Sequence, residues 1–343
     1  MNRTPDRSSK ANAPSAPRST PSRAAHFALR NLSLILLLAV FAFFGALAPH
    51  FFTWDNARNI LVQSAPTGVV AIGMTFVLLT AGVDLSVGAI MFVAAAVAGK
   101  MAASGQPVAL VLATILAVGT AFGALNGFLI TRLKVAAFIV TLSLLFTGRG
   151  LALWITQTRA MNLPEAYLQI GTARIAGLPL PLLAFAAIIA IAHVVLAHTP
   201  FGRHLYALGN HGENARKAGL HSGRLLLAVY AISGVCAAIG AILLLGQLGA
   251  VSPRFGENYE FKAIAAAVLG GTSLFGGRGA VFPGTLLGVM LIQTLESGLV
   301  ILNADPYLYP MVTAGVIFLA VLLDGIRTHV LASLSKRRIR STC

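Results

Sequence analysis

The chain has 343 residues, of which 57% are hydrophobic and only 10% are charged, and its mean hydropathy is +0.82. A soluble domain normally carries about 25% charged residues, so a chain this apolar could not cover its own surface with polar groups in water. The composition therefore excludes a water-soluble domain and predicts an integral membrane protein whose solvent is membrane lipid.

The net charge of +15 is unevenly distributed along the sequence. Basic residues concentrate in the N-terminal tail, in alternate loops and in the C-terminal run 336–340. This pattern is typical of cytoplasmic loops and not of a nucleic-acid-binding surface, so we expect no nucleic-acid partner. The two cysteines, Cys236 in an apolar stretch and Cys343 at the last position, are not expected to form a disulfide.

Residues 1–28 are rich in Ser, Pro, Ala and Arg and predict a disordered basic cytoplasmic tail. A transmembrane domain is expected over 29–326, followed by a basic cytoplasmic tail at 327–343. Its apolar segments have about the 20-residue length that crosses the hydrocarbon core. The expected spans are 31–48, 60–80, 86–104, 108–130, 136–156, 178–198, 225–248, 261–275, 281–302 and 309–323.

We therefore predict an all-α integral membrane protein with about ten transmembrane helices, including interrupted or re-entrant segments. The span at 261–275 is short and Gly-rich, and it either crosses or re-enters. Ten crossings place both termini on one side, where 18 of the 25 Lys and Arg residues then lie. Because basic residues favour the cytoplasmic side, both termini are expected there.

An acid separates the second and third expected spans in the run Thr80-Ala81-Gly82-Val83-Asp84-Leu85-Ser86-Val87-Gly88. We favour the interpretation that Asp84 is the N-cap of the third span. The alternative is an unwound segment at membrane depth that lines a polar cavity. The stretches 71–74 and 263–266 each lead into a Gly-interrupted break, and such paired breaks indicate a transport path.

Two sets of glycines recur at four-residue spacing on expected spans. Such spacing forms a flat stripe that lets a second helix approach closely, so these residues are expected to serve helix packing. They are Gly119, Gly123 and Gly127 on the fourth span, and Gly284 and Gly288 on the ninth.

The polar loop at 199–224 is predicted to be cytoplasmic. Residues Glu213 to Ala218 can form a short helix that Gly219 ends, because glycine readily adopts the left-handed conformation of a helix terminus. Taken alone, the loop is interpreted as an ordinary solvated connection.

The sequence contains no catalytic constellation that we recognise. A Walker A loop needs Gly-Lys followed by Ser or Thr, whereas Lys100 is the only lysine after a glycine and Met101 follows it. No His or Cys cluster has metal-ligand spacing, so neither a metal site nor an enzyme activity is expected. Glu296 is the one acid within an expected span, and it leaves open an ion-coupled secondary transporter as the alternative function.

Several stretches, in matching order and spacing, carry a family resemblance. They are 71–75, 79–88, Asn126-Gly127, 137–142, Arg149-Gly150-Leu151, Phe201-Gly202-Arg203, Tyr259-Glu260, 270–274, 276–279 and 320–324. Over about Trp54 to Asp324 the chain resembles the ribose/xylose/arabinose-type permease family of bacterial ABC importers, within the branched-chain amino acid/sugar permease superfamily.

The resemblance implies the transmembrane permease subunit of a binding-protein-dependent importer for a pentose or hexose, located in the bacterial inner membrane. Its implied partners are a second permease copy, two cytoplasmic ABC ATPase subunits and a periplasmic sugar-binding protein. ATP and Mg²⁺ would be used by the ATPase subunits, and this chain would bind no cofactor. The sequence identifies neither the sugar nor whether two identical permeases pair.

The resemblance also assigns roles to residues. It reverses the interpretation of the 199–224 loop, whose short helix would dock in a groove of the ATPase. The coupling residues would be Arg203, Glu213, Ala215, Arg216, Ala218 and Gly219. The residues along the sugar path or gate would be Asp84, Ser86, Asn126, Phe138, Thr141 and Glu260. The sequence departs from the family pattern at Asn214, at Phe261 and Lys262, and at Glu296.

Overall fold

The computed structural model describes residues 31–316, 318, 319 and 322. The chain divides into two compact units, residues 1–32 and 33–343, and only Asn31 and Leu32 of the first unit are described. All helices below belong to the second unit, apart from the first residue of α2. The tails predicted at 1–28 and 327–343 lie outside the described residues.

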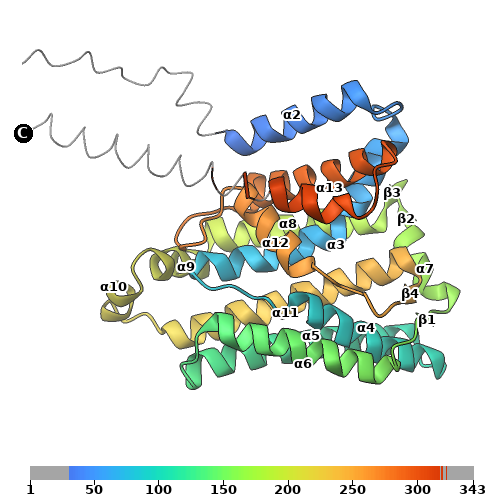
Figure 1. The fold of residues 1–343 in the computed structure, drawn as a ribbon. Coiled ribbons are helices and arrows are strands. Elements are labelled where there is room, and N and C mark those ends of the chain that lie inside the picture. Colours follow the sequence, from blue (N-terminus) through green and yellow to red (C-terminus); the bar gives the residue numbers. More distant parts are fainter. Residues whose placement is uncertain (1–30, 317, 320–321, 323–343) are drawn as a thin grey trace, which may run out of the picture. The chain divides into compact units, whose positions relative to one another are not determined.

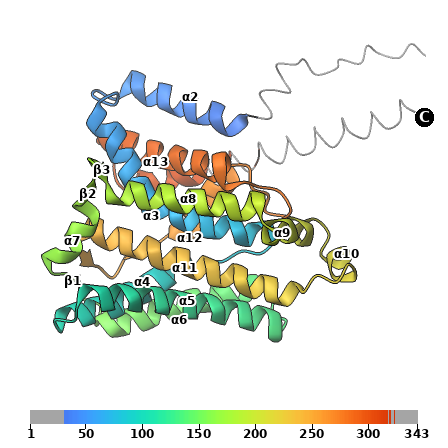
Figure 2. The ribbon, with the colours of Figure 1, turned by 180° about the vertical axis from the view of Figure 1, so that it is seen from behind.

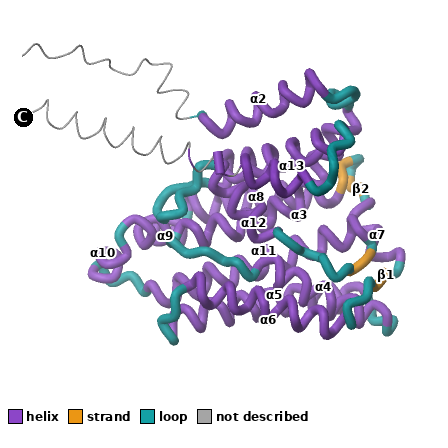
Figure 3. Tube along the Cα trace, in the orientation of Figure 1, coloured by secondary structure: helices purple, strands orange, loops and turns teal. Residues whose placement is uncertain are grey.

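The described chain is almost entirely helical (Figures 1 and 3). Its membrane-scale helices are α2 (Leu32–Leu47), α3 (Trp54–Leu79), α4 (Val87–Ala103), α5 (Val108–Arg132), α6 (Ala137–Thr156), α8 (Leu180–His198), α11 (Ser222–Leu248) and α13 (Leu286–Ile301). Shorter elements are α7 (Glu165–Thr172), α9 (Pro200–Asn210), α10 (Gly212–Lys217), α12 (Tyr259–Leu269) and the π-helical turn η1 (Val281–Thr285). Residues 308–316 are also helical.

Six helices among the described residues are long and apolar enough to cross a membrane, the sixth being η1 and α13 together. Two apolar helices, α2 and α4, are shorter. The prediction of an all-α membrane protein is confirmed, but the count of about ten crossings is not. The 11 residues of α12 reach only about 16 Å, half of the hydrocarbon thickness, which fits the re-entrant alternative for 261–275.

The helices of the second unit run side by side, and their connections gather at two ends (Figures 1 and 2). At one end, called the α10 end, lie α9 and α10. At the other, called the α7 end, lie α7 and two small antiparallel pairs, β1 (Met161–Asn162) with β4 (Ala250–Val251) and β2 (Arg174–Ile175) with β3 (Leu178–Pro179). Both regions were predicted to be loops, and neither α7 nor α9 was expected from the sequence.

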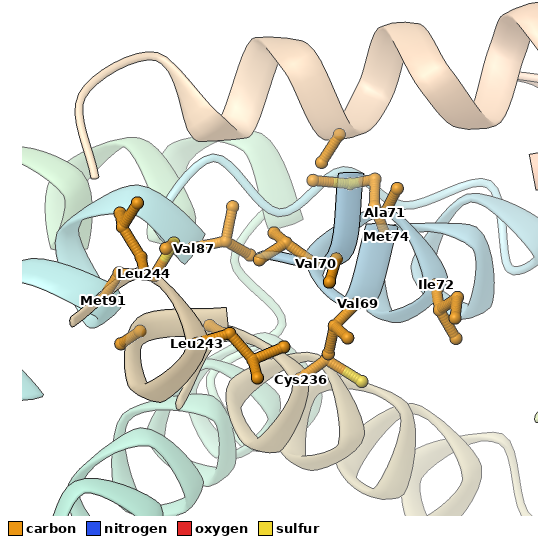
Figure 4. Close-up of a cluster of buried hydrophobic side chains, with 14 of the residues drawn as sticks. Val69, Val70, Ala71, Ile72, Met74, Val87, Met91, Cys236, Leu243 and Leu244 are labelled. Atoms are coloured by element: carbon orange, nitrogen blue, oxygen red, sulfur yellow. The ribbon is translucent and has the colours of Figure 1, made fainter. Parts of the chain in front are cut away.

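Helix α3 lies at the centre of the packed core (Figure 4). Its residues 69–72 and Met74 are buried, and the helix packs most closely against α11 and α12. Val87 and Met91 come from α4, and Cys236, Leu243 and Leu244 come from α11. Because lipid is as apolar as these side chains, close van der Waals contact rather than exclusion from water holds such helices together.

The glycine stripe of α5 faces α11 at backbone contact. A Cβ added at Gly119 would meet the Gly234 carbonyl oxygen at 2.6 Å, and one added at Gly123 would collide with the Tyr230 carbonyl oxygen. At Gly127 the added atom would lie 2.8 Å from the Cα of Leu227. A side chain at any of the three positions would therefore push α5 and α11 apart.

Gly284 and Gly288 likewise let η1 and α13 come into backbone contact with α12. Gly284 faces the carbonyl oxygen of Gly270, at 2.6 Å from an added Cβ, and a Cβ at Gly288 would collide with the carbonyl oxygen of Ala266. These contacts hold the short α12 against η1 and α13.

Substitution Gly123→Ala should destabilise the fold by about 1–3 kcal/mol, because the added methyl group meets α11 backbone that cannot move independently. Gly150→Ala is the matched control, since nothing in the described chain lies within 4 Å of a Cβ added there. The midpoint of thermal unfolding in detergent should fall for Gly123→Ala and hold or rise for Gly150→Ala. Equal midpoints would contradict the packing described.

Candidate functional site

The chain leaves the helical conformation between α3 and α4, well inside the bundle. α3 ends at Leu79, and α4 begins after the N-cap Ser86. Ser86 bonds to Asn126, six residues before Arg132 at the end of α5, a distance of about 9 Å along that helix. Ser233, which bonds to the same segment, lies about 16 Å into α11 from its first residue. Residues 80–86 therefore re-enter from the α10 end to membrane depth.

Asp84 organises this segment and is fully buried. One carboxylate oxygen accepts hydrogen bonds from the Ser86 amide at 3.0 Å and the Ser86 hydroxyl at 2.6 Å. The other accepts from the Ser233 hydroxyl of α11 at 2.8 Å. The Asn126 amide of α5 donates to the Ser86 hydroxyl at 2.7 Å. The segment between α3 and α4, α5 and α11 are thus joined by hydrogen bonds to Asp84 and Ser86.

The favoured interpretation of Asp84 as the N-cap of α4 is wrong in its geometry, because Ser86 holds that position. Asp84 lies two residues earlier and closes a local turn onto the Ser86 amide, while the Ser86 hydroxyl is engaged by Asp84 and makes no capping bond. The polar groups therefore satisfy an unwound segment at membrane depth, as in the alternative interpretation. That this segment lines a cavity stays a prediction.

Other polar groups complete the surroundings of Asp84. The Thr141 hydroxyl of α6 lies 3.4 Å from the Val83 carbonyl oxygen, although its shorter bond, at 2.9 Å, goes to the Ala137 carbonyl oxygen of its own helix. The Asn126 Oδ1 and the Tyr230 hydroxyl are buried and have no hydrogen-bond partner in the part of the chain that the structure describes. Buried groups without partners are unusual, and they make this cluster a site where bound water is expected.

A second polar cluster, besides the one at Asp84, lies where the start of α12 meets the start of α4. The Arg149 guanidinium of α6 donates to the Gly256 carbonyl oxygen at 3.0 Å. A Cβ added at Gly88 would collide with Glu260 Oε2 and the Gly256 carbonyl oxygen and would lie 3.5 Å from Arg149 Nη2. Glu260 is 3% exposed, and its Oε2 has no hydrogen-bond partner among the described residues.

The two short helices α4 and α12 therefore begin beside each other inside the bundle. From this point α4 runs toward the α7 end, and α12 runs toward the α10 end (Figure 1). Opposed half-helices that start at membrane depth are the arrangement in which transporters bind solutes, because helix N-termini and freed backbone groups supply hydrogen bonds there.

Glu296 of α13 is not a free carboxylate. It forms an ion pair with Lys262 of α12 at 2.6 Å, and the two side chains are 23% and 29% exposed. The ammonium group also lies 5.7 Å from the centre of the Tyr259 ring. Two positions at which the sequence departs from the family pattern thus face each other. The pairing leaves the ion-coupled alternative without an unpaired carboxylate at Glu296.

Polar contacts continue between α3 and α13 toward the α7 end. The Ser297 hydroxyl donates to Asn56 Oδ1 at 2.7 Å, and the Gln293 amide donates to Gln63 Oε1 at 3.2 Å. Such bonds between apolar helices are worth about 0.6 kcal/mol each in membrane proteins, so they fix register more than they add stability.

The remaining predicted path residue lies apart from these clusters. Phe138, in the first turn of α6, is 56% exposed. The coupling residues lie at the α10 end, where Ala215 is buried and Arg203, Glu213, Arg216, Ala218 and Gly219 are exposed. The short helix expected there is present, and Gly219 follows it at a φ of 86°.

Two residues that the structure brings to these clusters were not predicted from the sequence. Ser233 and Tyr230 lie in an apolar run of α11 that gave no signal. Arg149 was noted only as a matched position, although a cation within a span is itself a functional signal. Among the described residues, no three His, Cys, Asp or Glu side chains gather closely enough to hold a metal ion.

Comparison with known proteins identifies the family. The family described as the branched-chain amino acid transport system permease component matches residues 56–322. The chain belongs to this family. No solved structure matches the chain significantly.

Three relatives of known name match most of the chain. The ribose import permease protein of Haemophilus influenzae is 36% identical over 304 residues, which cover 87% of this chain and 94% of that protein. That of Bacillus subtilis is 38% identical over 296 residues, covering 85% and 91%. The D-allose transport system permease protein of Escherichia coli is 34% identical over 295 residues, covering 85% and 90%.

Removal of the α11 donor by Ser233→Ala should destabilise the permease by about 1.5–3 kcal/mol, because a buried carboxylate oxygen loses its partner. Asp84→Asn should destabilise it as well, since its amide group turns one acceptor into a donor that faces another donor. Ser143→Ala on the exposed face of α6 is the matched control. Thermal unfolding in detergent reports all three, and a Ser233→Ala midpoint equal to that of the control would contradict the assigned network.

Proposed function

We propose that this chain is the membrane-spanning permease subunit of a binding-protein-dependent ABC importer for a monosaccharide of the pentose or hexose type. ATP would be hydrolysed by two partner subunits on the cytoplasmic side, and a periplasmic binding protein would deliver the sugar. The permease would act as a pair of copies in the bacterial inner membrane, with both termini in the cytoplasm.

The observation that carries this proposal is the meeting of α4 and α12 within a bundle of apolar helices. At that point Arg149, Glu260 and the Gly256 carbonyl oxygen bring charge and hydrogen-bonding groups to membrane depth. Sugar hydroxyl groups need such donors and acceptors, because an unsatisfied polar group in an apolar medium costs several kcal/mol. Relatives that carry the names of ribose and D-allose permeases, matched over nearly their full length, support the sugar class.

The charged surface of α10 supports the part of the proposal that assigns ATP hydrolysis to a separate ATPase subunit. Its six residues expose Glu213, Arg216 and Lys217 and bury Ala215 against the protein. The Lys217–Glu213 pair at 2.9 Å is exposed and contributes little to stability, so these charges are available to a partner. A short, charged helix that projects from the α10 end suits docking into a groove of an ATPase.

Reconstitution in proteoliposomes tests the function. Purified permease, together with the ATPase and binding protein of its own transport system, should accumulate radiolabelled ribose or a related monosaccharide only when ATP is enclosed with the ATPase. Permease alone should accumulate none under a proton or sodium gradient. Uphill uptake by the isolated chain on an ion gradient would support the secondary-transporter alternative and overturn the proposal.

Coupling should depend on the end of α10. Gly219→Pro should abolish ATP-dependent uptake, because proline fixes φ near −65° and removes the amide that bonds the Arg216 carbonyl oxygen at 3.0 Å. The permease should still insert and purify, since Gly219 is exposed.

The matched control for that substitution is Gly219→Asn, because asparagine tolerates the left-handed conformation. This variant should keep most of the uptake. Normal uptake in Gly219→Pro, measured at equal amounts of inserted protein, would remove the coupling role from α10.

A further inference from the structure

The last turns of α9 bind the Gly-rich turn that follows α12. The Tyr206 hydroxyl donates to the Gly279 carbonyl oxygen at 2.9 Å. Four residues later, the Asn210 side-chain amide donates to the Gly277 carbonyl oxygen at 3.4 Å. Both acceptors are backbone groups in a segment that contains no helix, and these two side-chain bonds add to the turn's own bond from the Ser273 amide to the Arg278 carbonyl oxygen at 2.9 Å.

The same turn is bonded to the end of α3. The Gly277 amide donates to the Leu79 carbonyl oxygen at 3.0 Å, and Leu79 is the last residue of α3. A Cβ added at Gly209 would collide with both the Leu79 carbonyl oxygen and the Gly277 amide nitrogen. Backbone from α9, from the end of α3 and from the 276–279 turn is therefore in direct contact.

We call this contact the three-way junction and define it by Tyr206, Gly209, Asn210, Leu79, Gly277 and Gly279. Each of its three arms leads to a different part of the proposed machinery. Beyond α9, a single residue, His211, precedes α10. Beyond Leu79, the unwound segment reaches Asp84 within five residues, and beyond Gly279 the chain enters η1 at Val281.

The junction thus joins the helix proposed to contact the ATPase to both interrupted segments of the bundle. The linker between α9 and α10 is very short, since only His211 separates the two helices. A translation of α10 by more than a few ångströms must therefore move α9, because one extended residue reaches only about 3.6 Å. Movement of α9 in turn must carry the backbone of Leu79 and Gly277 or break the bonds that hold them.

We propose that the three-way junction transmits the movement of α10 to the two interrupted segments, with Tyr206 as its principal positioning residue. This inference rests on the proposed function, and it names the residues through which the permease would receive force from its ATPase.

Tyr206 is suited to the role by its chemistry. Its ring is partly buried and packs at the α10 end, and its hydroxyl makes the shortest side-chain bond in the junction. Burial raises the pKa of the Tyr206 phenol, so the hydroxyl remains protonated and able to donate at neutral pH. Substitution by phenylalanine removes this single bond and leaves the ring in place.

The test compares Tyr206→Phe with Tyr167→Phe in the full complex reconstituted in proteoliposomes. Tyr167 is the matched control, because its hydroxyl is buried in α7 at the opposite end of the bundle and has no hydrogen-bond partner in the described chain. ATP hydrolysis and sugar uptake are measured in the same vesicles. Tyr206→Phe should lower the sugar imported per ATP hydrolysed by about fivefold, the effect of one lost hydrogen bond, and Tyr167→Phe should leave that ratio unchanged.

Hydrogen exchange provides a readout that does not depend on transport. In Tyr206→Phe, amides of the segment 274–281 should exchange faster than in the wild type, because the Gly279 carbonyl oxygen loses the bond that ties this turn to α9. A second variant, Gly209→Ala, should have the same effect, with Gly223→Ala as control because a Cβ added there meets only Thr131, at 3.9 Å.

The outcomes separate this inference from the proposed function. If the wild-type complex fails to import sugar with ATP, the proposed function is wrong. If the wild type imports sugar, and Tyr206→Phe keeps both the wild-type ratio of sugar to ATP and the wild-type exchange of 274–281, the junction does not transmit the movement and the inference is overturned. Faster exchange together with a lowered ratio supports it.

Discussion

Lipid cannot hydrogen-bond a peptide group, and this chain nevertheless leaves the helical conformation inside the bundle between α3 and α4 and again around α12. The first interruption is satisfied by one carboxylate, Asp84, which accepts bonds from Ser86 and from Ser233 of α11. In the second, the Arg149 guanidinium donates to the Gly256 carbonyl oxygen, and Gly88 lets the start of α4 approach Gly256 closely. Placement of α4 and α12 depends on these few polar groups.

The bundle contains two kinds of helix, continuous ones and short ones that start inside it. α3, α5 and α11 are continuous helices, α11 packs against both of the others, and the stripe Gly119, Gly123 and Gly127 leaves no space between α5 and α11. α4 and α12 are short, start inside the bundle and connect through non-helical segments. In a transporter built this way, the continuous helices would serve as the frame, and the shorter helices would change position against it.

Much of this architecture could be predicted from the sequence, because long apolar runs and Gly spacing report directly on spans and on close helix contacts. The short helix that Gly219 ends was also predictable, since its signals are local. What the sequence could not supply was contact between distant residues. Ser233 becomes a partner of Asp84 only when α11 packs beside α4, and the Arg149–Gly256 bond joins positions 107 apart in the chain. The cap interpretation of Asp84 failed partly for the same reason, because the Ser233 donor depends on tertiary structure, although the bonds from Ser86 are local.

The ion pair between Lys262 and Glu296 constrains how this protein can diverge. Either charge left alone at a mostly covered position in an apolar bundle is far more costly than the pair, or than two neutral side chains of similar size. A lineage that loses one of the two is therefore under pressure to lose the other or to restore the first. Among descendants of this sequence, the lysine and the glutamate should be inherited together or replaced together, so the residue at either position should predict the residue at the other.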